Sequence, residues 1–555
     1  MNTHNLLFKN IWLITLFFNT HMEIKGQENN FESRVPKFNY PTTLKQQMKA
    51  LEADPLMHRF KASRAKFNND LYRPTYHFVS PEGRLNDPNG LSFWNGKWHL
   101  FYQAYPPEDP RQHWGHAVSE DLVHWKDLPY AIYPGPERAS FSGSAWVEDD
   151  RVIVMYHGTE KGNMIAIADD PLLLNWKKLG GKAVIPLESN SKSPQPYTVF
   201  DPFIWKKENT YYSLSGSRGP NGPGGKPIRA HYLFKSKNLL DWEYLHEFVV
   251  DDRFTKIGDD GACPYFWPIG NRHILLFFSH LSGAQYLLGD YDELNDKFNA
   301  TSHGKFNFGT SRPSGIHAPS AFPDGKGGVI AIFNINRGKV FNEWDQVMSL
   351  PRQLSLVSED EIRIEPVEAL SSLRKEGIKM DHIELPRSKE TLLEKVQGNT
   401  LEIVAEVDMR KSEMVEINVL RSPDKEEYTK IIFYKNKGDY KGLEYNKGTK
   451  EAEYYKRARY SLVSLETTYS SSLSDVNYRV PETAPVLLDP DENLNLRIFI
   501  DKSIIEVFVN GKQCIGARVF PSRADSLGVS FFSQGNDAEL IKLEAYPMKN
   551  IYIEP

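Results

Sequence analysis

The sequence contains only two cysteines, Cys263 and Cys514, in a chain of 555 residues. A disulfide framework therefore cannot organise the fold, and these two residues, in different repeats, predict free or buried thiols rather than a bridge. Charge of neither sign dominates, because 67 Lys and Arg stand against 72 Asp and Glu. The chain lacks a basic field that would attract nucleic acid, so we expect no nucleic-acid partner.

The sequence also shows no run that predicts a membrane span. The apolar run at residues 11–18 follows Lys9 and is too short to cross a bilayer. This arrangement is typical of a signal peptide, placed here at residues 1–26, and predicts a secreted or periplasmic protein. The 16 histidines are scattered without the spacing of metal ligands, so we expect neither a metal nor a cofactor.

Aromatic residues are abundant, at 12% of the chain, which favours a β-rich architecture and suits contact with sugar rings. Asp87 begins a strand-turn-strand unit in which an Asn-Gly turn at 95–96 separates two apolar-aromatic runs. The unit recurs with heads at residues 142, 201, 262 and 318, roughly 55 to 61 residues apart. The repeat predicts a five-bladed β-propeller at residues 76–366, with the five heads converging on a central pocket.

The sequence before and after this repeat does not show the blade pattern. Residues 27–75 are polar and helix-favouring around 43–53, which predicts an N-terminal extension packed on the first blade. Residues 367–389 are predicted to be a linker that begins with a short helix or connector. Period-two alternation then marks residues 400–407, 416–420, 494–500 and 503–509. Residues 390–555 are therefore predicted to form a β-sandwich, and the fold class is all-β: a five-bladed β-propeller followed by a C-terminal β-sandwich.

Two of the five heads carry an aspartate followed by proline, Asp87 and Asp201. In a propeller these carboxylates would face each other across a narrow channel. Paired carboxylates in an aromatic-lined pocket are what glycoside hydrolysis needs, since one attacks or stabilises the anomeric carbon and another protonates the leaving oxygen.

Several short motifs strengthen this interpretation. Asn-Asp-Pro-Asn-Gly stands at 86–90, Phe-Tyr-Gln at 101–103, Trp-Gly-His-Ala at 114–117, Phe-Ser-Gly-Ser at 141–144 and Met-Ser-Leu-Pro-Arg at 348–352. Asp-Lys-Ser at 501–503 and Glu-Val-Phe at 506–508 lie in the predicted sandwich. With these motifs the chain resembles glycoside hydrolase family 32, the β-fructofuranosidases, from about residue 76 to its end.

The resemblance implies a role for each matching residue. Asp87 would be the nucleophile of a retaining mechanism, and Asp201 would stabilise the transition state by gripping ring hydroxyls. The side chains implied to bind the sugar are Asn86, Gln103, Trp114, Phe141 and Ser142.

Two positions depart from the family pattern. Phe200 replaces the arginine that precedes the second aspartate, and Ala262 replaces the acid/base glutamate, although alanine cannot transfer a proton. Three explanations stay open: the acid is Asp260, two residues back along the strand; the pocket takes a different furanoside with an acid from another blade; or the protein binds sugar and hydrolyses it slowly or not at all.

We therefore expect a secreted glycosidase that cleaves β-fructofuranosides of the sucrose, inulin or levan type, or a related furanoside. Its partner would be an oligo- or polysaccharide substrate. The alternative is a carbohydrate-binding protein on the same scaffold with weak or no hydrolysis.

Overall fold

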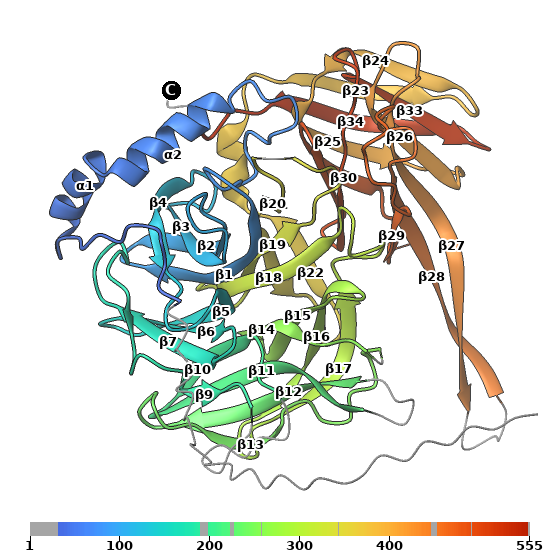
Figure 1. Ribbon diagram of the computed structural model, residues 1–555. Coiled ribbons are helices and arrows are strands. Elements are labelled where there is room, and N and C mark those ends of the chain that lie inside the picture. The colour runs from blue at the N-terminus through green and yellow to red at the C-terminus, as the bar shows by residue number, and fades with distance from the viewer. Residues whose placement is uncertain are drawn as a thin grey trace, which may run out of the picture.

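The computed structural model describes residues 31–188, 198–221, 227–256, 258–341, 343–445, 452–489 and 491–552. The predicted signal peptide at 1–26 lies outside these residues. A ring of five sheets and a two-sheet body stand beside each other in Figure 1, with two N-terminal helices along the first sheet. In the described part of the chain, neither helix has the length and apolar character that crossing a membrane requires.

Five sheets form the predicted propeller. Blade 1 contains β1 (Leu85–Trp94), β2 (Lys97–Ala104), β3 (His113–Ser119) and β4 (Lys126–Ile132). Blade 2 contains β5 (Ser140–Val147), β6 (Val152–Gly158), β7 (Gly162–Ala168), β8 (Lys177–Lys178) and β9 (Ile185–Pro186). Blade 3 contains β10 (Pro202–Lys207), β11 (Thr210–Asn221), β12 (Pro227–Ser236) and β13 (Glu243–Glu247).

The ring is completed by two further sheets. Blade 4 contains β14 (Ala262–Ile269), β15 (Arg272–Ser279), β16 (Gly283–Asp292) and β17 (Lys297–Lys305). Blade 5 contains β18 (Ile316–Pro323), β19 (Val329–Ile335), β20 (Val347–Met348), β21 (Arg352–Leu356) and β22 (Ile362–Pro366). The predicted five-bladed architecture is confirmed. The first strands β1, β5, β10, β14 and β18 contact one another in turn, so they line the centre of the ring.

Local turn chemistry explains why the blades form where the repeat predicts them. Asn95 and Gly96 both have positive φ, at 48° and 77°, as a two-residue hairpin turn requires, and Trp94 pairs with Lys97 across it. The first strands are largely buried because neighbouring blades cover them: in β1, Leu91 and Asn89 are both completely buried.

The second body is a sandwich of two six-stranded sheets. One sheet contains, in order, β23 (Ile378–Leu385), β34 (Ala538–Pro547), β25 (Thr400–Asp408), β30 (Leu494–Asp501), β31 (Ile504–Val509) and β32 (Gln513–Arg518). The other contains β24 (Glu390–Gln397), β33 (Gly528–Gln534), β26 (Met414–Arg421), β27 (Thr429–Tyr445), β28 (Ala452–Glu466) and β29 (Glu482–Val486). The predicted linker is a short 3₁₀ helix, η1 (Glu368–Leu373), followed by β23, so the sandwich begins before residue 390.

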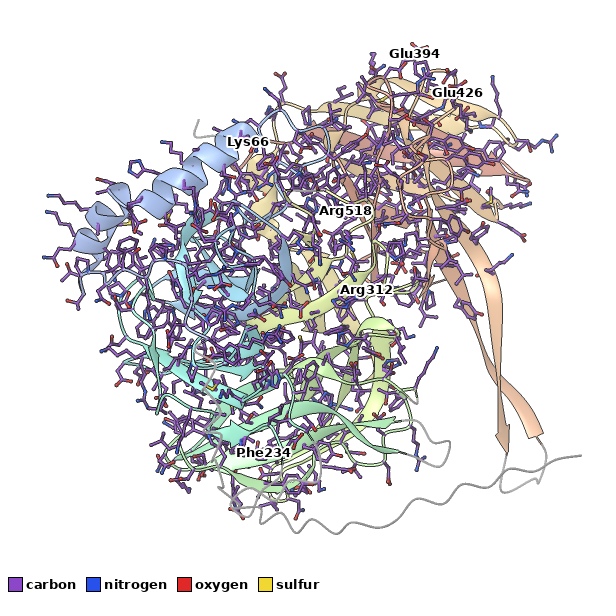
Figure 2. The ribbon with its side chains drawn as sticks, in the orientation of Figure 1. Lys66, Phe234, Arg312, Glu394, Glu426 and Arg518 are labelled. Carbon is purple, nitrogen blue, oxygen red and sulfur yellow. The ribbon has the colours of Figure 1, made fainter. Side chains whose placement is uncertain are left out.

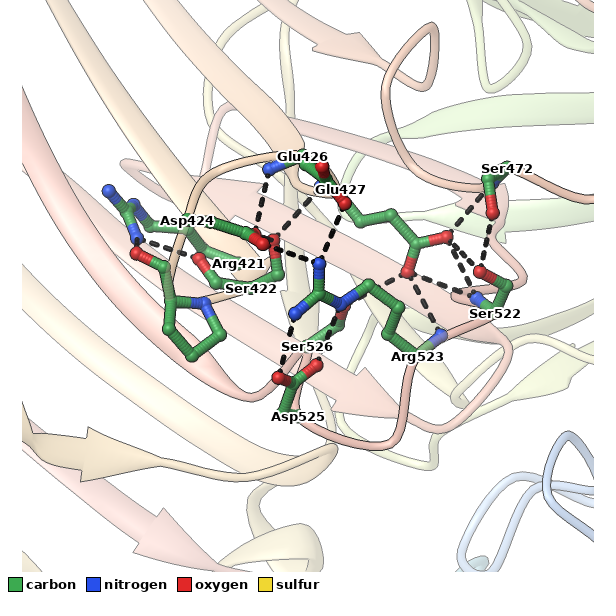
Figure 3. Close-up of polar contacts among 11 residues, drawn as sticks. Arg421, Ser422, Asp424, Glu426, Glu427, Ser472, Ser522, Arg523, Asp525 and Ser526 are labelled. Carbon is green, nitrogen blue, oxygen red and sulfur yellow. Dashed lines mark hydrogen bonds and ion pairs between the residues drawn. The ribbon is translucent and has the colours of Figure 1, made fainter.

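A buried carboxylate, Glu427, closes the loops at one end of this sandwich. Figure 3 shows its two oxygens accepting hydrogen bonds from Ser472, Ser522, Arg523 and Ser526. Three segments that are distant in sequence are thereby held together, because burying the charge of Glu427 is costly unless hydrogen bonds compensate it.

The N-terminal extension forms α1 (Leu44–Glu52) and α2 (Pro55–Lys66). Asp54 caps α2 by accepting from the backbone of residues 56 and 57, and Pro55 occupies the first helical position, where its missing N–H costs nothing. Arg64 donates two hydrogen bonds to Asp127 of β4, so the extension packs on blade 1 as predicted.

Buried charges join the propeller to the sandwich. Asp501 accepts hydrogen bonds from the backbone N–H groups of residues 75–77 and lies 3.0 Å from Nδ1 of His77. Nε2 of His77 lies 3.1 Å from Glu506, which also accepts from Arg352. Burial opposes protonation of His77, but the two carboxylates outweigh it and raise its pKa. Arg518, labelled between the two bodies in Figure 2, adds a hydrogen bond to the backbone carbonyl of residue 345.

Candidate active site

Four of the five central strands carry an irregularity at the same place, directly at their heads. The pairing register shifts between Leu85 and Pro88 in β1, between Ser140 and Gly143 in β5, between Ala262 and Tyr265 in β14, and between Ile316 and Pro319 in β18. Each shift is a β-bulge, which turns side chains out of the regular pleat. The bulged residues include Asp87, Ser142, Cys263 and His317, whose side chains converge at one end of the ring axis.

Asp87 lies at the centre of this group. Its Oδ2 accepts a hydrogen bond of 2.8 Å from Ser142 and one of 3.4 Å from Gln103, and its Oδ1 lies 3.6 Å from Nδ1 of His317. Burial opposes ionisation, but His317 and Ser142 outweigh it and hold the pKa of Asp87 below its ordinary value. Asp87 is therefore a carboxylate at neutral pH, the form that a nucleophile needs.

Asp201, at the head of β10, faces the same space from blade 3. Its Oδ2 accepts from the backbone N–H of Cys263 at 3.2 Å and from the Cys263 thiol at 3.3 Å. Burial and the negative charge of Asp87 raise the pKa of Asp201 to about 7. The two carboxyl groups thus titrate over different pH ranges, as two groups with different roles in one site require.

Of the other residues that the sequence predicts to bind the sugar, some lie near Asp87, whereas Trp114 is buried below the pocket. Gln103 bridges Ser142 and Asp87, with 2.7 Å between its Nε2 and Ser142 Oγ. Asn86 accepts from Asn334 of β19 at 3.0 Å, which fixes its amide at the head of β1. Trp114 is fully buried and donates to the carbonyl of Phe141 at 2.8 Å. It therefore supports the half-buried Phe141 from below instead of presenting its own ring.

At the head of blade 4 the structure differs from a regular strand. Asp260 precedes the first residue of β14, Ala262, and Gly261 and Cys263 both have positive φ, so the expected face alternation does not extend back to Asp260. Its Oδ1 accepts from the backbone N–H of His280 at 3.2 Å, and its Oδ2 lies 2.5 Å from Nδ1 of the same residue. The carboxyl group of Asp260 is therefore engaged by His280.

Sequence reasoning missed two histidines, His317 and His280. The repeat predicts the fifth head at residue 318, one position beyond His317, because the spacing of a repeat does not reveal a bulge. His280 follows β15 and returns to the pocket because Ala262 pairs with Phe278. In the sequence, each of these histidines is marked only by its position next to a strand that the repeat predicts.

Several buried polar atoms in this site have no hydrogen-bond partner among the described residues. They are Oδ1 of Asp87, Oδ1 of Asp201 and both ring nitrogens of His317; the 3.6 Å between Asp87 Oδ1 and His317 Nδ1 is too long for a hydrogen bond. Buried acceptors and donors without partners are costly, and the closely spaced hydroxyls of a sugar are suited to satisfy them. Among all the residues that the structure describes, no three His, Cys, Asp or Glu side chains lie close enough together to bind a metal ion.

Comparison with known families decides the assignment. Residues 77–366 match the glycosyl hydrolases family 32 N-terminal domain, and residues 369–547 match the glycosyl hydrolases family 32 C terminal domain. The chain belongs to glycosyl hydrolase family 32. Its resemblance in sequence motifs is thus confirmed, and it is a glycosidase by family.

Relatives in family 32 match over most of the chain. It is 26% identical to a levanase of Bacillus subtilis, with 88% of this chain and 72% of the relative covered. It is 27% identical to a sucrose-6-phosphate hydrolase of Zymomonas mobilis, with 86% and 92% covered. Among solved structures, fructan 1-exohydrolase IIa of Cichorium intybus has the same fold, with a TM-score of 0.73, 21% identity, and coverage of 87% and 98%.

Proposed function

We propose that this protein hydrolyses β-fructofuranosides of the sucrose, inulin or levan type with retention of configuration. The proposal is supported above all by Asp87, an ionised carboxylate where the blade heads meet, whose buried Oδ1 has no hydrogen-bond partner among the described residues. The names of the family 32 relatives, a levanase and a sucrose-6-phosphate hydrolase, support the substrate class.

The geometry supports a two-step reaction. Oδ1 of Asp87 attacks the anomeric carbon, the glycosidic bond breaks, and a covalent fructosyl-enzyme ester forms. Ser142 and Gln103 hold Oδ2 and keep the carboxylate oriented for this attack. Asp201, with its pKa near 7, can donate a hydrogen bond to one ring hydroxyl or accept from another. Water then attacks the ester and releases the sugar with retained configuration.

The amino-terminal segment belongs to the same proposal. Residues 1–26, with Lys9 before an apolar run, are proposed to direct the protein to the periplasm or the outside of the cell. Polymeric fructans do not cross a membrane freely, so this location suits a polysaccharide substrate.

The test is sugar release from sucrose, inulin and levan by the purified protein and by an Asp87→Asn variant. We expect release that Asp87→Asn abolishes, because an amide cannot form the ester. Asp149→Asn is the matched control, since Asp149 is exposed in the turn after the far end of β5, and it should leave release unchanged. Equal activity of Asp87→Asn and the unmodified protein would refute the role of Asp87.

A second candidate function is carbohydrate binding with weak or no hydrolysis. Two observations favour it: Ala262 carries no acid group, and Phe200 contacts His157 with 5.4 Å between ring centroids where the family has an arginine. Calorimetric titration with the same sugars separates the two functions. Saturable binding without any sugar release would establish the binding protein, whereas hydrolysis of each bound sugar would exclude it.

A further inference from the structure

Replacement of the family glutamate by Ala262 leaves the pocket without its usual proton donor. The methyl group of Ala262 is fully buried and has no proton to transfer. Protonation of the leaving oxygen is worth roughly 10²- to 10⁴-fold in rate, so an active enzyme needs another acid near Asp87 and Asp201.

Three titratable groups beside the two carboxylates fit this role poorly. The Cys263 thiol is buried and faces both carboxylates, and burial and these charges raise its pKa well above its ordinary value. His317 is also buried, and its desolvation lowers its pKa, so it stays neutral beside the nucleophile. Tyr105 has its pKa raised to about 12, mainly by burial, so proton transfer from it near neutral pH is unfavourable.

We propose that His280, oriented by Asp260, is the general acid and base of this active site. The proposal rests on the proposed function, because it supplies the proton transfer that hydrolysis of a fructoside requires. It gives Asp260 a role other than the one expected from the sequence: Asp260 acts as a positioning residue, and the imidazole of His280 transfers the proton.

The geometry around His280 is that of a held imidazole. Asp260 is 3% exposed and contacts both the backbone N–H and Nδ1 of His280, while Ser311 donates to the His280 carbonyl at 3.2 Å. A carboxylate on Nδ1 fixes the tautomer and leaves Nε2 to carry the transferable proton. Within the described ranges no group hydrogen-bonds Nε2, and the side chain is 37% exposed. The rings of Phe278 and His317, which also contact each other, pack against the imidazole with 4.8 and 5.8 Å between ring centroids.

The charges that face His280 favour its protonated form. Asp260, on the loop before β14, raises the pKa of His280 most, and Asp201 and Asp87 raise it further, against the effect of partial burial. The imidazole in turn stabilises the ionised forms of both Asp87 and Asp201. On the side of β18, neutral His317 packs against the ring. Exposed Arg312, labelled in Figure 2, precedes β18, and its charge lowers the pKa of His317.

The proposed proton transfers balance over the two steps. In the first, Nε2–H of protonated His280 is transferred to the glycosidic oxygen as Asp87 bonds to the anomeric carbon, and the leaving group departs as a neutral alcohol. In the second, neutral His280 removes a proton from water as its oxygen bonds to the anomeric carbon and Asp87 is released. His280 is again protonated, and one water has been consumed.

The test compares two leaving groups in the full-length protein and in a His280→Asn variant. Sucrose needs protonation of its leaving oxygen, whereas p-nitrophenyl β-D-fructofuranoside releases a stable phenolate without it. We expect His280→Asn to slow sucrose hydrolysis roughly 10²- to 10⁴-fold and to slow formation of the fructosyl-enzyme from the aryl fructoside far less. Because the comparison lies within one variant, a partly misfolded sample lowers both rates and leaves their ratio intact.

Two further variants complete the test. Asp260→Asn removes the charge that favours protonated His280, so we expect the alkaline limb of the kcat/KM profile to move to lower pH. His382→Asn is the matched control: His382 pairs with Glu539 through Nδ1 at 2.8 Å in the sandwich, and its loss should change neither rate.

The possible outcomes distinguish a failure of the role proposed for His280 from a failure of the proposed hydrolytic function. Equal losses on both substrates, or no loss on sucrose, in an otherwise active enzyme would overturn the role of His280 alone. An alkaline limb unmoved by Asp260→Asn would overturn the positioning role of Asp260. An unmodified protein that hydrolyses neither substrate would overturn the proposed function together with this inference.

Discussion

Substitution of Asp201 by asparagine should make the protein more stable at neutral pH while impairing its activity. Burial and the charge of Asp87 raise the pKa of Asp201 to about 7, against an ordinary value of 3.8. As pH rises from 3.8 toward 7, the unfolded chain loses this proton while the folded chain retains it. The contribution of Asp201 to the stability of the folded state is therefore fully present below pH 3.8, and it is lost as the pH rises through the folded-state pKa.

The size of this effect follows from the shift. One pKa unit corresponds to about 1.4 kcal/mol, so raising the pKa of Asp201 to about 7 costs on the order of 4 kcal/mol above neutral pH. The amide that replaces this carboxyl group in Asp201→Asn has no proton to lose, so the variant escapes this cost. The stability advantage of Asp201→Asn should therefore grow by about 3 kcal/mol between about pH 5 and about pH 8.

Urea unfolding followed by tryptophan fluorescence measures this difference at each pH. A second variant, Asp87→Asn, removes the neighbouring negative charge and should reduce the pH dependence that Asp201 causes, because burial alone then raises its pKa. Parallel stability profiles for Asp201→Asn and the unmodified protein would refute the reasoning, since they would mean that Asp201 titrates at its ordinary value.

Two further predictions concern the nucleophile and the contact between the two bodies. Ser142→Ala removes a 2.8 Å hydrogen bond to the ionised form of Asp87, so we expect the pKa of Asp87 to rise and the acid limb of kcat/KM to move to higher pH. A pH–rate profile measures this, and an unmoved limb would contradict it. Asp501→Asn breaks the buried pair with His77 and should lower the free energy of unfolding by about 3 to 5 kcal/mol in urea titrations. Asp525→Asn, at an exposed pair in the same sandwich, is the control and should cost less than about 1 kcal/mol.

Much of the architecture could be predicted from the sequence, because it depends on short-range chemistry. Asn-Gly at 95–96 and again at 510–511 provides the positive φ that a tight hairpin needs, and the structure places a hairpin turn at each. The spacing of the heads was sufficient to count five blades. The prediction of free or buried thiols is also confirmed: Cys263 and Cys514 are buried and unbridged, one in the propeller and one in the sandwich.

The finer geometry of the site could not be predicted, because it depends on bulges and on pairing between strands. One extra residue in β14 and in β18 brings Cys263 and His317 to the pocket in place of their neighbours. The same irregular backbone places Asp260 off the strand and against His280. No pattern in the sequence encodes that contact, since it forms only when β15 folds back along β14.

The start of the sandwich and the burial of Trp114 also could not be predicted, because both depend on tertiary packing. The apolar residues of β23 stand at 378 and 380 and then at 383 and 385, so the alternation changes phase within the strand. The sequence therefore predicts a linker there, although residues 378–385 pair with β34. The family resemblance implies that Trp114 binds the sugar, whereas packing against Phe101 and Tyr156 buries its ring in the blades. Whether a side chain lies on a pocket or beneath it depends on tertiary packing.

The most direct test of the account is the mass of the peptide that contains Asp87 after rapid acid quenching of the reaction with p-nitrophenyl β-D-fructofuranoside. The account predicts that this peptide gains the mass of one fructosyl group and that fragmentation places the gain on Asp87. Release of p-nitrophenol with no fructosyl group on Asp87, or with the group on another carboxylate, would contradict it.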